Sequence, residues 1–169
     1  MRLQHRIAIV TGAGSGFGRG IATRFAAEGA RVVVNDVNEA HGAETVAAIR
    51  AAGGSAALCI ADVSKDADVA RLVRCALEAF GGLHVVVNNA GAIRRNVRLH
   101  EVGVERWDEQ IASNLRGPYL VTHAALPELL RAEGDRAIVN VASTLAVKPV
   151  PGEQVTDNNE ADFTVIFTR

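Results

Sequence analysis

The sequence predicts an α/β fold in which a doubly wound parallel sheet is covered by helices on both faces. Five short apolar runs alternate with longer amphipathic stretches along most of the chain. The apolar runs are nearly continuous, which is typical of parallel strands buried on both sides. Right-handed crossovers between such strands produce the doubly wound arrangement. A chain of 169 residues suits one domain with a substantial core.

The five apolar runs are short and rich in Val, Ile and Ala, as buried strands usually are. The first is "RIAIVTG", the second "ARVVVND" and the fourth "LHVVVNNAG", and each ends in small or polar residues. Ligands of open α/β sheets bind where such strands end. The predicted strands span 6–11, 31–36, 55–61, 83–91 and 136–142.

The stretches between the strands have the polar and apolar spacing of helices that cover a sheet. Gly29 is a suitable stop for the first helix, and Ser64 is the predicted N-cap of the third. The last helix is long, and Pro118 and Pro127 are expected to kink or reset it. The predicted helices span 16–29, 39–54, 64–82 and 104–131.

Composition argues against several classes of function. The formal net charge is -1 and the pI is near 6.5, so no basic surface for nucleic acid is expected. No apolar run approaches the roughly 18 residues of a membrane span, and the N-terminus lacks a signal peptide's apolar segment. We therefore expect a cytoplasmic protein with no membrane partner. Cys59 and Cys75 are expected to be reduced core residues, and the histidines show no metal-binding spacing.

The stretch "TGAGSGFG" lies directly between the first strand and the first helix. Glycines at such a turn let the backbone approach a pyrophosphate closely, and the helix N-terminus offers free N–H groups. A glycine pattern alone is a weak indication, but the strand before it and the helix after it strengthen the prediction. The alternative is a tight turn without a ligand.

Asp36 ends the second strand, 18 residues after Gly18. A carboxylate at this place can accept hydrogen bonds from both ribose hydroxyls of an adenosine and would repel a 2′-phosphate. Ser15 and Phe17, rather than Arg or Lys, stand in the glycine turn. The predicted cofactor is therefore NAD rather than NADP. The alternative for Asp36 is an N-cap of the second helix.

Two further strand ends carry candidate cofactor contacts. Asp62 and Val63 follow the third strand, where they could contact the adenine amino group and ring face. The alternative for Asp62 is a helix N-cap shared with Ser64. "NNAG" ends the fourth strand, and its small residues allow close passage of a bound ribose. We expect Asn88 and Asn89 to bond either the backbone or the cofactor.

"TGAGSGFG", "NNAG", "SNLRG" and "IVNVAS" occur in an order and spacing that resemble the short-chain dehydrogenase/reductase family, in its classical subfamily. The resemblance covers about residues 5–152. It implies a Rossmann-like sheet of strand order 3-2-1-4-5, and hydride transfer between NAD and a secondary alcohol or ketone. The cofactor contacts it implies are Gly12, Ser15, Gly16, Phe17, Gly18, Asp36, Asp62, Val63, Asn89, Ala90 and Gly91.

The resemblance also implies two catalytic positions. Asn114, in "ASNLRG", matches the asparagine that supports a proton-relay water, although a simple helix kink is the alternative there. Ser143, at the end of "VNVAS", matches the serine that bonds the substrate oxygen.

The pattern fails at the residues that transfer the proton. The family uses a tyrosine followed four residues later by a lysine, which lowers the tyrosine pKa from its usual ~10. The single tyrosine here, Tyr119, is followed by His123, and the expected slots fall near Thr156 and Glu160. The chain as given is therefore expected to be inactive.

The character of the sequence changes after about residue 152, so we expect an NAD-binding domain over 1–152 and a divergent tail over 153–169. The tail is interpreted as a truncated or out-of-frame ending, a remnant of a longer chain, or an adaptation that pairs "FTVIFT" with the sheet edge. The function alternative is a non-catalytic nucleotide-binding or interaction module. A second copy of the chain is a candidate partner, since family members often form homo-oligomers through the helix that carries Asn114.

Overall fold

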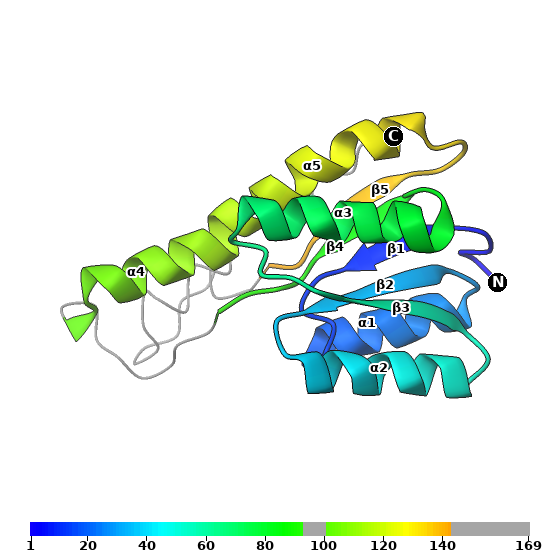
Figure 1. Ribbon diagram of the computed structural model, residues 1–169, viewed down its shortest axis with the longest axis horizontal. Helices are drawn as coiled ribbons and strands as arrows, with labels where there is room; N and C mark the ends of the chain where they lie inside the picture. Colours follow the sequence, from blue (N-terminus) through cyan, green and yellow to red (C-terminus); the bar gives the residue numbers. More distant parts are fainter. Residues whose placement is uncertain (93–100, 143–169) are drawn as a thin grey trace.

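The five predicted strands form one parallel sheet in the order β3-β2-β1-β4-β5, which confirms the doubly wound fold (Figure 1). The computed structural model describes residues 1–92 and 101–142. Most strands are slightly shorter than predicted, because their polar ends leave the sheet to form loops. The strands are β1 (Ile7–Val10), β2 (Arg31–Asp36), β3 (Ser55–Ile60), β4 (Val85–Asn88) and β5 (Ala137–Asn140).

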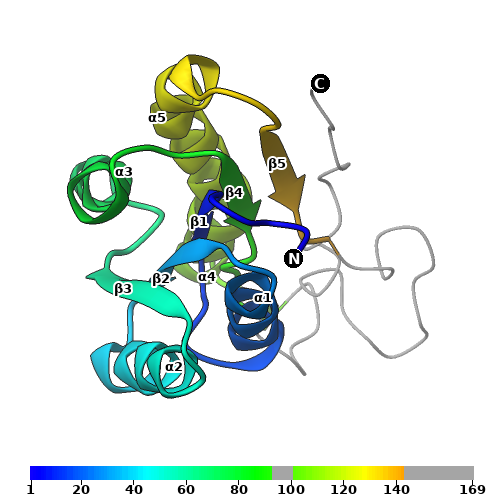
Figure 2. The same ribbon diagram turned by 90° about the vertical axis from the view of Figure 1, so that its right-hand side faces the viewer.

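Helices cover both faces of this sheet. Figure 2 shows α1 and α2 on one face and α3 and α5 on the other. At the end where the strands finish, α4 continues beyond the sheet (Figure 1). The helices are α1 (Gly16–Ala27), α2 (Glu39–Ala51), α3 (Asp66–Phe80), α4 (Val104–Ile111) and α5 (Gly117–Arg131), with the π-helical turn η2 (Ala112–Arg116) between the last two.

The core consists of two apolar layers, one on each face of the sheet. Ile7 and Ile9 of β1 belong to the layer under α3 and α5, whereas Ala8 and Val10 belong to the layer under α1 and α2. Successive strand side chains point to opposite faces, so a strand buried on both sides must be apolar throughout. Full burial of an Ile or Val side chain contributes about 1.5–3 kcal/mol to stability.

The helix caps differ in part from those predicted. Gly29 follows the end of α1 with φ of 92°, a left-handed conformation that suits glycine. The prediction that Ser64 caps α3 is wrong, because the N-cap position is Lys65 and makes no side-chain cap bond. The Ser64 hydroxyl instead donates to Asp62 Oδ1 over 2.7 Å. Ser64 thus stabilises the loop after β3 rather than the helix.

The predicted long helix over 104–131 is present, but it contains the π-helical turn η2 at its centre. At the end of this turn, the Gly117 N–H donates to the Ala112 carbonyl, five residues back. Pro118 comes next and has no N–H to offer the Asn114 carbonyl, so ordinary α-helical bonding fails here. Such π turns occur frequently at functional sites. This one carries Asn114, which is buried.

Both cysteines are free, as predicted: Cys59 is buried on β3 and Cys75 is half-buried on α3. Over residues 1–92 and 101–142, no helix is long and apolar enough to cross a membrane. The same residues contain no group of three or more His, Cys, Asp and Glu side chains placed to hold a metal ion.

Candidate nucleotide-binding site

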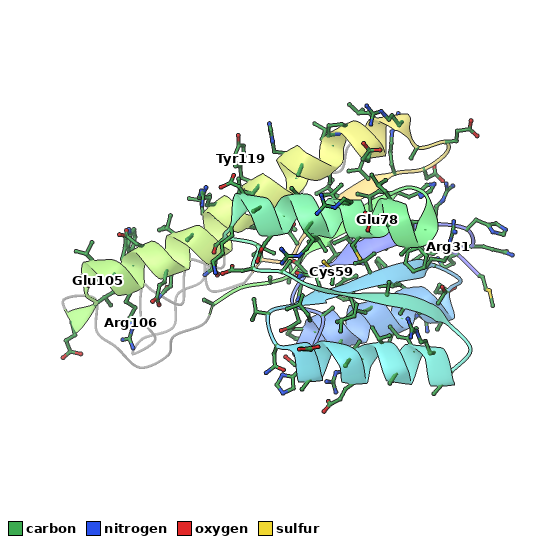
Figure 3. The ribbon with its side chains drawn as sticks, in the orientation of Figure 1. Arg31, Cys59, Glu78, Glu105, Arg106 and Tyr119 are labelled. Carbon is green, nitrogen blue, oxygen red and sulfur yellow. The ribbon has the colours of Figure 1, made fainter. Side chains whose placement is uncertain are left out.

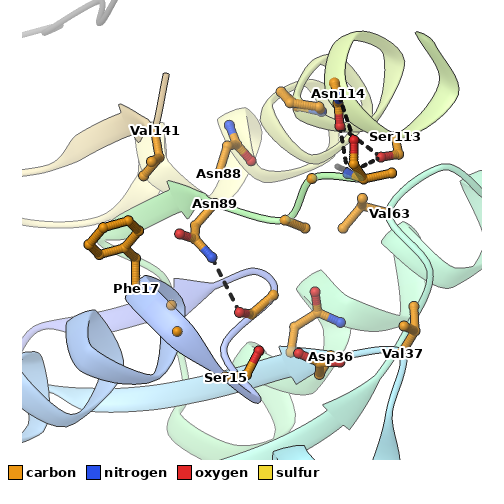
Figure 4. A pocket seen from close by; sticks show the side chains of 18 of the residues that line it. Ser15, Phe17, Asp36, Val37, Val63, Asn88, Asn89, Ser113, Asn114 and Val141 are labelled. Atoms are coloured by element: carbon orange, nitrogen blue, oxygen red, sulfur yellow. Dashed lines mark hydrogen bonds between the residues drawn. The ribbon is translucent and has the colours of Figure 1, made fainter. Parts of the chain in front are cut away.

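A groove of about 1080 Å³ runs along the carboxyl ends of the strands (Figure 4). Its wall is formed by the residues that follow each strand, together with η2 and the start of α1 and α5. The groove brings together every predicted cofactor contact and one predicted catalytic residue: Gly12, Ser15, Gly16, Phe17, Gly18, Asp36, Asp62, Val63, Asn89, Ala90, Gly91 and Asn114.

The glycine turn combines tight packing with an open surface. A Cβ atom on Gly18 would lie 2.2 Å from the Gly12 carbonyl oxygen, so this part of the turn has no room for a side chain. A Cβ on Gly16 would meet nothing within 4 Å, and Gly16 faces the groove with φ of 51°. Ser15, the N-cap of α1, makes no side-chain cap bond. The helix N-terminus is therefore presented to the groove without a side chain over it, which fits a phosphate group.

Hydrogen bonds join the glycine turn to the segment after β4. The Thr11 hydroxyl donates to the Val87 carbonyl over 3.2 Å and accepts from the N–H groups of Asn89 and Ala90 over 2.9 Å each. The Asn89 side-chain amide donates to the carbonyls of Thr11 and Gly12, over 2.9 and 3.2 Å. These bonds give the floor of the groove a fixed shape. We did not assign Thr11 a role from the sequence, although a hydroxyl after an apolar strand was a usable indication.

Asp36 faces the groove from the end of β2, with its carboxylate held by two backbone groups (Figure 4). Oδ2 accepts from the Gly14 N–H over 2.8 Å, and Oδ1 accepts from the Asn38 N–H over 2.9 Å. Because a carboxylate offers about four acceptor positions, both oxygens keep capacity for a ligand. The N-cap alternative for Asp36 is wrong, since the Asn38 side chain caps α2 by accepting from the His41 N–H.

Asp62 adds a second carboxylate to the groove. Its Oδ1 accepts from the Ser64 N–H over 3.0 Å and from the Ser64 hydroxyl, and its Oδ2 pairs with Lys65 over 3.2 Å. Burial on its own would raise the Asp62 pKa, but the bonds from Ser64 and Lys65 outweigh this effect and lower the pKa. The cap alternative for Asp62 is wrong, because its side chain bonds the Ser64 turn rather than the end of α3. Val63 lies beside it and is 7% exposed.

The opposite end of the groove is lined by neutral amides. The Asn88 side chain donates to Asn140 Oδ1 over 2.8 Å and to the Thr122 hydroxyl over 3.2 Å. Asn88 Oδ1 is buried and has no hydrogen-bond partner. Asn114 accepts from the Ala92 N–H over 2.8 Å and donates back to the Ala92 carbonyl over 3.2 Å. Asn114 therefore ties η2 to the end of the "NNAG" segment, while its role in a proton relay stays a prediction.

The residues that would transfer the proton do not appear in the described wall of the groove. The predicted substrate-bonding serine, Ser143, lies outside the described residues, as do Thr156 and Glu160, which occupy the slots expected for the tyrosine and lysine. Tyr119 projects outward from α5, is 61% exposed and stacks near His123 with ring centroids 5.7 Å apart (Figure 3). It is not part of the groove.

Several groove residues were missed by sequence reasoning. They occupy positions next to the predicted ones, at strand ends or on η2 and α5. Asn35 is an example: its buried amide donates to the carbonyls of Cys59 and Ala61, over 3.1 and 2.9 Å. These bonds join the ends of β2 and β3 beneath the groove. A polar residue inside "VVVND" was the available indication. The missed lining residues are Asn35, Val37, Ala61, Ala92, Ser113, Pro118, Asn140, Val141 and Ala142.

Comparison with known proteins gives consistent matches along most of the chain. The family model for short chain dehydrogenases matches residues 6–155. The chain is 44% identical over 152 residues to 4-formylbenzenesulfonate dehydrogenase TsaC1/TsaC2 of Comamonas testosteroni, covering 90% of this chain and 60% of that protein. It is 39% identical over 151 residues to an uncharacterized oxidoreductase of Thermotoga maritima, covering 89% and 59%.

Solved structures agree with this result. A short chain dehydrogenase/reductase from Burkholderia phymatum, solved in complex with NAD, superposes with a TM-score of 0.88 at 34% identity. The alignment covers 95% of this chain and 56% of that one. The chain thus spans about 60% of the length of the curated relatives it matches. With a family model over most of its length and a matching fold, the chain belongs to the short-chain dehydrogenase family of oxidoreductases.

Proposed function

We propose that the groove binds NAD(H), with residues 1–152 as the cofactor-binding part of an oxidoreductase. The reaction would be hydride transfer between NAD and a secondary alcohol or ketone. The relative from Burkholderia phymatum, solved with NAD, supports the choice of cofactor. Location in the cytoplasm and self-association stay predictions from the sequence.

The observation that carries the proposal is the charge of the groove. Its described lining contains two carboxylates, Asp36 and Asp62, and no Lys or Arg. Without a cation, a 2′-phosphate beside Asp36 would meet repulsion and no compensating partner. An adenosine ribose with free hydroxyls would instead donate to the carboxylate. The groove therefore favours NAD over NADP.

The residues present fit the cofactor in a simple order along the groove. The bare N-terminus of α1 at Gly16 would hold the pyrophosphate, because its N–H groups and helix dipole attract anions. Asp36 would hold the adenosine ribose, and Asp62 and Val63 the adenine. The segment from Asn89 to Gly91 would line the nicotinamide side. NAD supplies or accepts the hydride when bound, and the protein orients it.

On the substrate side, Ser143 is proposed to bond the reacting oxygen and Asn114 to support a relay water. Both assignments come from the family resemblance rather than from contacts with a ligand.

A second candidate is a nucleotide-binding or interaction module without catalysis. One observation favours it: the printed sequence contains no tyrosine with a lysine four residues later, and Tyr119 lies outside the groove. A phenol that titrates near pH ~10 cannot serve as a ready base at neutral pH without such a cation.

Two measurements on the 169-residue chain test these candidates together. NADH fluorescence should change saturably on titration with the protein, and failure to do so would contradict both the oxidoreductase and the nucleotide-binding module. NAD reduction should then be followed with a panel of secondary alcohols. Turnover at ordinary enzyme rates would exclude the module, whereas tight NADH binding without any turnover would favour it.

A further inference from the structure

Arg19 makes a set of contacts that none of the cofactor assignments uses. It lies in the first turn of α1, just after the glycine turn, and is not part of the groove wall. Its Nε and Nη2 atoms both donate to the Gly14 carbonyl, over 2.9 and 2.5 Å. The same two nitrogens donate to the Thr45 hydroxyl and to Glu44 Oε2 of α2, each over 3.0 Å. One side chain therefore joins the glycine turn to α2.

The Gly14 residue that Arg19 holds is also in direct contact with Asp36. The Gly14 N–H donates to Asp36 Oδ2 over 2.8 Å. A Cβ on Gly14 would lie 2.6 Å from Asp36 Oδ2 and 2.9 Å from His41 Cβ, so Gly14 is enclosed between the ribose-binding carboxylate and α2. Because the peptide unit is planar and trans, fixing the Gly14 carbonyl toward α2 also fixes the Ser15 N–H in the opposite direction.

This arrangement matters because a dinucleotide has to reach two separate anchors. The glycine turn precedes α1, whereas Asp36 belongs to β2. A dinucleotide that contacts the glycine turn and Asp36 at the same time binds well only if the distance between these two anchors matches its own length. If either anchor is displaced, the contact at the other is weakened. Arg19 contacts the turn at Gly14, whose N–H is bonded to Asp36, and it is not part of the groove wall. It is therefore placed to set that spacing without lining the site.

Most of this control lies in the bonds to Gly14 rather than in the ion pair. Glu44 is 63% exposed at its side chain and Arg19 39%, so water screens their attraction. The Gly14 carbonyl is enclosed by comparison, since the hydroxyl of Thr45, which is fully buried, donates to it over 3.5 Å. Among the described residues, loss of the guanidinium would leave this carbonyl with only the long bond from Thr45, whereas loss of the Glu44 charge would leave its bonds to Arg19 in place.

We propose that Arg19 is a positioning residue for the cofactor, which fixes the glycine turn at the spacing from Asp36 that one dinucleotide requires. This inference rests on the proposed NAD(H)-binding function. Loss of Arg19 should therefore weaken the binding of ligands that contact both the glycine turn and Asp36, and should leave unchanged the binding of ligands that contact only one of them.

The test compares ADP-ribose, which spans both anchors, with adenosine, which reaches Asp36 alone. Calorimetric or competition titrations of the full 169-residue chain give the dissociation constants. Arg19→Met should raise the constant for ADP-ribose about tenfold and change that for adenosine by less than about twofold. Arg19→Lys should recover part of the loss, because an ammonium can still donate to the Gly14 carbonyl. Glu44→Gln should stay within about twofold of the wild type.

Arg24→Met is the matched control. Arg24 lies on the same helix and pairs with Glu28 over 2.5 Å, but it does not contact the turn. It should bind both ligands like the wild type. An equal loss of both ligands in Arg19→Met, or unchanged ADP-ribose binding in it, would overturn the inference while leaving the proposed function in place. If the wild type itself binds neither ADP-ribose nor NADH, the proposed function fails and the inference falls with it.

Discussion

The two ends of the parallel sheet differ in charge. At the carboxyl end, the large groove is lined by two carboxylates, several amides and no cation among its described residues. At the amino end lies a smaller hollow of about 270 Å³ whose described lining includes Arg2, Arg6 and Arg136. Parallel strands bring like ends together, so each end collects the residues that precede or follow every strand.

Among the described residues, the lack of cations in the groove wall is therefore a matter of placement. The chain has 18 Lys and Arg residues. Two described cations near the carboxyl end are bound to partners of their own: Lys65 to Asp62, and Arg19 to Glu44 and the Gly14 carbonyl. Under the proposed function, the groove would attract phosphate through backbone N–H groups and a helix dipole instead of side-chain charge. Such a site can accept a pyrophosphate and still disfavour a third phosphate beside Asp36.

The largest expected effect comes from filling the glycine turn at the carboxyl end. Gly18→Ala places a methyl group 2.2 Å from the Gly12 carbonyl oxygen, so the turn has to move. We expect unfolding free energy to fall by about 2–3 kcal/mol and the NADH dissociation constant to rise about a hundredfold. Gly20→Ala on the same helix has nothing within 4 Å of the new methyl and should be stabilising by about 0.5–1 kcal/mol. Urea denaturation and NADH titration of the two variants check this, and similar behaviour of both would contradict it.

A smaller effect is expected from removing the negative charge of Asp36, one of the two carboxylates that distinguish the carboxyl-end groove from the amino-end hollow. Asp36→Asn loses charge-assisted bonds to the ribose, so NADH should bind about tenfold more weakly while NADPH binds more tightly than before. Asp135→Asn, which alters a carboxylate of the amino-end hollow, should leave both constants unchanged. Titrations with the two nucleotides measure this. A parallel loss of NADH and NADPH in Asp36→Asn would refute the role of its charge.

The smallest effect concerns the amino end and depends on pH. Burial lowers the pKa of His84, and the nearby Arg6 and Arg31 lower it further. His84 Nδ1 also accepts from the Ile7 N–H over 3.3 Å, which requires the neutral ring. His84 therefore binds a proton more readily in the unfolded chain than in the folded one. Its contribution to the free energy of unfolding is fully present above the ordinary histidine pKa of about 6.5 and is lost as the pH falls below it.

His84→Gln should therefore show a flatter dependence of stability on pH between about 7.5 and 5 than the wild type. Denaturant midpoints at several pH values provide the measurement. His41→Gln, at the other end of the sheet, is the control and should keep the wild-type slope. If His84→Gln and the wild type lose stability in parallel, the pKa of His84 is not lowered by burial and the nearby cations as described.

The fold was predictable because its periodicities are strong. The strand "RVVVND" is apolar on both faces, and the structure places β2 at the predicted residues 31–36. The helix over 104–131 also has the predicted limits, since its pattern continues through the irregular turn. The π-helical turn itself was not predictable from pattern. It depends on Pro118, which removes one N–H, and on the tertiary bonds of Asn114 to Ala92.

The candidate site was predictable where the backbone forms it and less so where side chains from different elements meet. Strand-end residues such as Gly12 and Asp36 could be placed because all parallel strands end at one edge. The Arg19 contacts could not be foreseen, because they join residues 14, 44 and 45 through the mutual position of α1 and α2. The Ser64 cap was mispredicted for a similar reason: Asp62 competes for its hydroxyl.

One titration tests the central claim most directly: the binding of NADH and NADPH to the 169-residue chain under identical salt and pH. A groove with the Asp36 carboxylate at the ribose position and no cation in its described wall should bind NADH at least about tenfold more tightly than NADPH. Equal affinities, or tighter binding of NADPH, would contradict the account.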